Sequence, residues 1–126
     1  LTSAGAGAQP AFEDVASGFP APDFTSSEQT VTIDTLLNVA HGLGALPVLV
    51  QVVLRCKTAE FGFSIGDELQ AGSLHQDALD RGSSTSIDAT NVTIIQANLI
   101  TVIAQSTLNL AGLVPARWKW VVRAWS

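Results

Sequence analysis

The sequence predicts an all-β fold, an antiparallel β-sandwich of about six or seven strands. Several segments alternate apolar and polar residues with a period of two, which is typical of strands with one buried face. No segment of useful length has the 3.6-residue period of a helix, and 47% of the 126 residues are apolar, enough for one core. We therefore expect one sandwich domain over residues 28–126, preceded by an extended tether over residues 1–27.

The tether is predicted from its composition. Ala, Gly, Pro and Ser dominate residues 1–27, and no periodicity is present. Such a segment cannot bury enough apolar surface to offset its own ordering entropy, so if it is ordered it must lie along another surface. Three phenylalanines are the candidate anchors for that contact: Phe12, Phe19 and Phe24. The absence of methionine and the start at Leu1 lead us to expect that the chain is part of a longer polypeptide.

Two strands are predicted in the first half of the domain. Residues 30–39 alternate, with Val31, Ile33, Leu37 and Val39 on one side. His41 then precedes two glycines, and we expect it to hydrogen-bond this turn. Residues 48–57 form the second strand, because every even position there is apolar. Cys56 lies in this run and is expected to be a small buried residue.

The second half is predicted to contain a short strand at residues 61–65, a long polar loop at residues 70–86, and a hairpin of residues 91–96 and 99–105. Three hairpin side chains are expected to be buried: Ile100, Val102 and Ala104. Residues 117–125 close the domain, with Trp118, Trp120, Val122 and Ala124 on one face.

The charge balance excludes several classes of partner. Only six basic residues are present and the net charge is −5, so neither nucleic acid nor anionic lipid is an expected partner. Residues 89–116 lack charge, but amide side chains interrupt them, and two strands fit better than a membrane helix. Charged residues make up 13% of the chain, so we expect a homo-oligomer that buries apolar strand faces. The expected interface residues are Leu49, Val53, Val121 and Trp125.

One group of polar residues is a candidate ligand-binding loop. It consists of His75, Asp77, Asp80 and Arg81, with Asn109 from a later turn. Their spacing matches no catalytic nucleophile or triad and no calcium or zinc motif, so we expect no enzyme, no cofactor and no metal. The alternative is that these are solvated loop residues.

Two parts of the sequence carry a resemblance to known proteins. Residues 1–12, LTSAGAGAQPAF, resemble a segment that recurs in bacteriophage fibre and spike proteins just before a terminal domain. From about Thr30 the order of elements resembles the H-type lectin-like β-sandwich, through HGLG at 41–44, Pro47 and its Val-rich strand, NVT at 91–93, and WVVRAW at 120–125.

This resemblance implies a homotrimer at the surface of a virion, joined to other virion proteins through the tether. It implies the C-terminal domain of a phage fibre or spike, exposed for attachment to a host-surface glycan. The sequence departs from lectin members at residues 106–113, where an aromatic and acidic turn is missing. A capsid decoration, collar or adaptor subunit is the alternative, and a polysaccharide-degrading fibre tip is a third.

Overall fold

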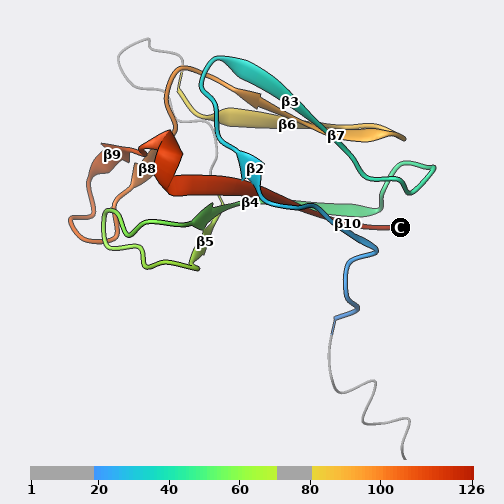
Figure 1. Ribbon diagram of the computed structural model, residues 1–126, viewed down its shortest axis with the longest axis horizontal. Helices are drawn as coiled ribbons and strands as arrows, with labels where there is room; N and C mark the ends of the chain where they lie inside the picture. The colour runs from blue at the N-terminus through green and yellow to red at the C-terminus, as the bar shows by residue number, and fades with distance from the viewer. Residues whose placement is uncertain (1–18, 71–80) are drawn as a thin grey trace, which may run out of the picture.

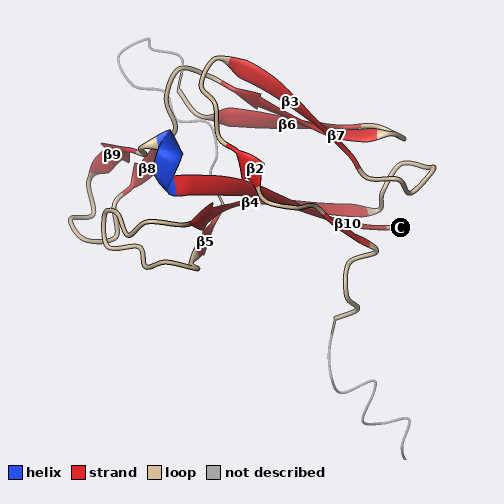
Figure 2. Ribbon diagram, in the orientation of Figure 1, coloured by secondary structure: helices blue, strands red, loops and turns tan. Residues whose placement is uncertain are grey.

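Two antiparallel sheets face each other in the computed structural model, which describes residues 19–70 and 81–126 (Figures 1 and 2). Sheet A contains β1 (Phe24–Thr25), β2 (Gln29–Thr30), β10 (Trp118–Trp125), β4 (Leu49–Cys56) and β5 (Glu68–Leu69). Sheet B contains β3 (Thr35–Ala40), β7 (Asn91–Gln96) and β6 (Ser83–Ile87). A small pair, β8 (Thr101–Ile103) and β9 (Leu110–Gly112), lies at one end, followed by the 3-10 turn η1 (Pro115–Arg117). The predicted all-β sandwich is confirmed.

The centre of sheet A is the pairing of β4 with β10. The two strands pair along their full eight-residue lengths, from Trp118 opposite Cys56 to Trp125 opposite Leu49. The predicted alternation is confirmed, because Trp118, Trp120, Val122 and Ala124 are all buried. They pack with the inward side chains of sheet B and of β8 to form the core, which includes Leu54, Val92, Ile94, Ile100 and Val102. Cys56 is fully buried as expected, and burial raises the pKa of its thiol.

The strand predicted over residues 30–39 is divided in two. β2 belongs to sheet A and β3 to sheet B, so the chain crosses between the sheets within this segment. Asp34 makes the crossing with a φ of 54°, and the Thr35 hydroxyl donates to the Thr32 carbonyl at 2.6 Å. Ile33 is 41% exposed as a result, whereas Val31 and Val39 are buried as predicted. Aspartate tolerates the left-handed region, so no glycine marked this turn in the sequence.

The predicted hairpin of residues 91–96 and 99–105 is wrong in its pairing. β7 pairs with β3 and β6, and β8 pairs with β9. Sheet B bonding continues one residue past β7, since the amide of Ala97 donates to the Gly82 carbonyl, and the amide of Gly82 then donates to the carbonyl of Leu99, ahead of β8. The prediction that Ile100, Val102 and Ala104 are buried is confirmed.

Two further local predictions are corrected. Residues 61–65 form a turn, because Phe61 and Gly62 have φ values of 52° and 88° and Glu60 bridges Phe63. Residues 83–86, expected in a loop, belong to β6. Their Ser and Thr side chains carried no apolar alternation, yet pairing with the apolar strand β7 makes them a strand.

The sandwich includes residues assigned by sequence to the tether. β1 pairs with β10, and the amide of Ser26 donates to the Val122 carbonyl at 2.8 Å. The pairing begins at least as early as Asp23, whose amide donates to the Ala124 carbonyl at 3.0 Å. Residues 23–27 therefore form part of sheet A, ahead of the boundary placed at residue 28.

Candidate interaction surfaces

The predicted ligand-binding loop falls mostly outside the described residues, which do not include His75, Asp77 and Asp80. Arg81 is half-buried and points toward β8, where its Nη1 lies 3.4 Å from the Thr101 hydroxyl. Asn109 is exposed in the β8–β9 turn, and its carbonyl accepts a hydrogen bond from the Ala104 amide. No contact joins Arg81 to Asn109 among the hydrogen bonds of the described residues.

Two of the three predicted aromatic anchors contact the sandwich, and Phe12 lies outside the described residues. Phe24 is half-buried against the core. Phe19 is 70% exposed, but its ring meets Trp125 edge-on at a centroid distance of 5.6 Å. The Trp125 indole also donates to the Pro20 carbonyl at 2.9 Å. The final strand therefore holds the segment that leads into the domain.

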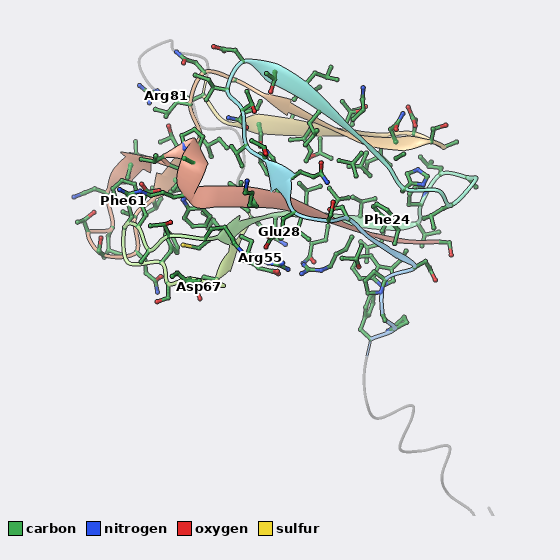
Figure 3. The ribbon with its side chains drawn as sticks, viewed as in Figure 1. Phe24, Glu28, Arg55, Phe61, Asp67 and Arg81 are labelled. Atoms are coloured by element: carbon green, nitrogen blue, oxygen red, sulfur yellow. The ribbon has the colours of Figure 1, made fainter. Side chains whose placement is uncertain are left out.

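The outer face of sheet A is covered by a network of charged side chains, here called the ion network. Glu68 from β5 accepts hydrogen bonds from Arg123 on β10 at 2.7 Å and from Arg55 on β4 at 2.9 Å. Glu28 contacts Arg55 at 3.1 Å and Lys57 at 3.0 Å, and it reaches them on the same face from the opposite edge of the sheet. Figure 3 shows Glu28 and Arg55 side by side on this face. The network thus joins three strands and the β1–β2 segment.

The ion network changes the pKa of its carboxylates. Hydrogen bonds from Arg123, with a further contribution from Arg55, lower the pKa of Glu68 to about 2. Hydrogen bonds from Lys57 and Arg55 lower the pKa of Glu28 from its ordinary value. Both carboxylates are therefore charged across the neutral and mildly acidic range.

The ion network lies over two of the four predicted interface residues. Val53 and Val121 are only 2% and 1% exposed in the single chain, although they lie on the outer face of sheet A. Arg55 and Arg123 flank them on the two strands and are joined by Glu68, and the stems of such side chains cover apolar surface. Leu49 is 45% exposed and Trp125 is half-buried, so these two remain accessible.

The outer face of sheet B has the opposite character. Pairing register and alternation place eight side chains there, none of them charged. Leu36 and Ile95 are register partners and are 58% and 44% exposed. Asn38 accepts a hydrogen bond from the Thr93 hydroxyl at 2.7 Å beside them. We call this surface the uncharged face: Leu36, Asn38, Ala40, Ser84, Ser86, Asn91, Thr93 and Ile95.

Two buried polar groups stabilise the loops. His41 is 3% exposed and contacts the Asp88 carbonyl through Nε2 at 2.9 Å, while Nδ1 accepts from the Leu43 amide at 3.1 Å. The structural interpretation of His41 is confirmed.

Glu60 is 7% exposed and accepts from the Trp118 indole at 2.8 Å and from the Val114 amide at 3.1 Å. Sequence reasoning missed Glu60, since its partners lie more than fifty positions away.

The described residues contain no group of three or more His, Cys, Asp or Glu side chains arranged to hold a metal ion. Within the same ranges, no helix is long and apolar enough to cross a membrane. Three features of the described surface have distinctive chemistry: the ion network, the uncharged face, and a groove at the edge of β4.

No protein-family model matches the chain, and no curated protein is significantly similar to it. The fold and these surfaces define an all-β domain of the sandwich class.

Proposed function

We propose that the protein is a virion structural protein, the C-terminal domain of a trimeric phage fibre or spike, exposed for attachment to the host surface. The observation that carries the proposal is the difference between the two outer faces of the sandwich. Sheet A carries the ion network, whereas the uncharged face of sheet B has no charge on any of its three strands.

The uncharged face suits contact with further copies of the chain. Interfaces between subunits are depleted of charged residues at their centres, because each buried charge must be paired. The uncharged face offers two exposed apolar side chains, Leu36 and Ile95, surrounded by small hydroxyl and amide groups. Such groups keep their hydrogen bonds with a partner or with bound water. Charged residues make up only 13% of the chain, and such a low share is also expected of a chain that buries surface in an oligomer.

The path of the chain into the domain suits a fibre. Phe19 contacts Trp125 and Asp23 contacts Ser126, so the entering segment and the C-terminus lie together. Such a junction suits a fibre, because load on the entering segment then acts on β10, one of the two eight-residue strands at the centre of the sheet. The resemblance of residues 1–12 to the segment that precedes terminal domains in phage fibres points the same way.

Host attachment is tested with the whole protein on host cells and on a glycan array. We expect a signal that falls when His75, Asp77 and Asp80 of the predicted ligand-binding loop are substituted, with Ser64→Lys, an exposed position outside that loop, as the control. Absence of any signal, together with loss of particle stability when the protein is omitted, would instead support a capsid decoration subunit.

A further inference from the structure

A groove runs along the edge of β4 that faces away from β10, where β5 is the one described strand that pairs with it. It has a volume of about 700 Å³, within the range of sites that hold a ligand or a peptide side-chain array. β5 pairs only with Leu54 and Arg55, and no described strand pairs with residues 49–53 on that side. β6 bounds the other side of the groove through Thr85 and Ile87.

Both faces of β4 line this groove. Val50 and Val52 face the interior of the sandwich, whereas Leu49 and Gln51 face outward, and all four line the groove. A pocket on one face of a sheet would contact only alternate residues of a strand. An occupant that meets successive residues must therefore lie along the strand edge.

The backbone of β4 is oriented for a further strand. The Cys56 amide donates to the Asp67 carbonyl at 2.8 Å, on the β5 side. Since backbone groups of successive residues point to opposite sides of an antiparallel strand, Val50 and Val52 direct theirs to the same side as Cys56. Their N–H and C=O groups face the groove, where an added strand would satisfy them.

The charges along the groove define the chemistry of the occupant. Arg123 is the single charged residue among its described lining, and its guanidinium is held by both Glu68 oxygens at 2.9 and 2.7 Å. A charged side chain entering the groove would lose water and find no free partner. The inward wall is made of Val50, Val52, Thr85 and Ile87, which favours small or β-branched apolar side chains.

We propose that this groove is a strand-addition site, which takes an uncharged, extended segment of another polypeptide with apolar residues at alternate positions. Because β6 closes the far side, the space admits a single extended segment, not the edge of a second folded sandwich. About five residues would be held, since residues 49–53 span roughly 17 Å.

The test uses the full chain and a fluorescently labelled, end-blocked heptapeptide of alternating threonine and valine, measured by fluorescence anisotropy. We expect saturable binding. N-methylation of alternate peptide residues, and lysine in place of the valines, should each weaken it by about tenfold or more, because they remove edge hydrogen bonds or introduce charge.

Variants of the protein locate the site. Val50→Pro removes an edge N–H and leaves the β4–β10 hydrogen bonds, which come from the odd-numbered residues of β4, in place. Ile87→Lys puts a charge into the groove and decides the matter if Val50→Pro does not fold. Both should weaken binding by about tenfold. Ser84→Lys, which points outward from β6, should bind as the unchanged protein does, even if it alters the oligomeric state.

Three results would overturn the strand-addition site. They are absence of binding at millimolar peptide, equal binding of the N-methylated peptide, and a change in the protein's own oligomeric state on Ile87→Lys without peptide. The last result would mean that a second copy fills the groove. The first two results leave the proposal for the uncharged face untouched, whereas the third would move a subunit contact from that face to the groove.

Discussion

At the scale of single residues, the buried carboxylate of Glu60 fixes the junction between β9 and β10. Its Oε2 accepts from both Trp118 and Val114, and Arg117 lies 3.7 Å from Oε1. When a buried donor loses its acceptor, the folded protein keeps the full desolvation cost of that donor. Glu60 therefore stabilises the fold through the donors that it satisfies as well as through its charge.

We predict that Glu60→Ala lowers the free energy of unfolding by about 2–4 kcal/mol, because the buried Trp118 indole and the partly buried Val114 amide lose their acceptor. Urea denaturation followed by tryptophan fluorescence measures this. Glu60→Gln keeps an acceptor oxygen and should lose less than half as much. A Glu60→Ala midpoint equal to that of the unchanged protein would refute the assigned role.

Glu68 makes the stability depend on acid pH. The pKa is lowered from 4.5 to about 2 in the folded protein. Stabilisation from this depressed pKa is present above pH 4.5 and is lost as pH falls toward 2. Since the side chain is 30% exposed, we expect solvent screening to leave about 1–2 kcal/mol.

Urea midpoints measured between pH 5 and pH 2 test the Glu68 prediction. The midpoint should fall over this range, and Glu68→Gln should flatten the fall in part, since the pKa values of Glu28, Asp23 and Asp88 are also lowered. An unchanged slope in Glu68→Gln would show that the ion network does not stabilise the fold.

At the scale of elements, β4 and β10 were predictable and the turns were not. In each strand, inward-facing and outward-facing residues alternate over eight positions, and this pattern predicts both the strand and its buried face without knowledge of the strands that pair with it. The crossing at Asp34 uses a positive φ at a residue other than glycine, so no glycine or proline announced it. In the turn at Phe61 and Gly62 the positive φ values begin at Phe61, and the single glycine stands between two phenylalanines that suggested a strand. β6 became a strand through pairing with β7, which sequence alternation does not report.

The β1 segment gives a prediction at this scale. A chain beginning at Phe19 retains the pairing of β1 with β10 and the contact of Asp23 with Ser126, whereas a chain beginning at Glu28 loses both. We expect the shorter chain to unfold at a lower urea concentration. Its free energy of unfolding should be lower by about 2 kcal/mol or more, because Phe24 leaves the core. Equal midpoints would show that the domain begins at residue 28.

At the scale of the whole molecule, the sequence predicted the fold class, but it did not predict that Val53 and Val121, two of the expected interface residues, are buried within the single chain. Their alternation with Arg55 and Arg123 marks an outward face correctly. The ion network that lies over these two valines depends on Glu28 and Glu68, which are 27 and 13 positions from Arg55. Sequence patterns do not reveal ion pairs between residues so far apart. The uncharged face was equally hidden, since it requires the register of three strands.

Ser86→Lys tests the uncharged face. It places a charge on that face, on the edge strand β6 and opposite Thr93 of the central strand β7 in register. We expect the oligomer to dissociate into folded monomers, with unchanged circular dichroism, because unpaired charge is costly in an interface. Ser64→Lys, in the exposed loop before β5, should leave the oligomer intact; dissociation of both variants would argue against a specific interface.

The most direct measurement is the mass of the full chain in solution at micromolar concentration, by size-exclusion chromatography with light scattering. The trimer proposed here predicts three times the 13.1 kDa of the single chain, about 39 kDa. A stable monomer of 13.1 kDa would contradict both the interface on the uncharged face and the assignment to a trimeric fibre.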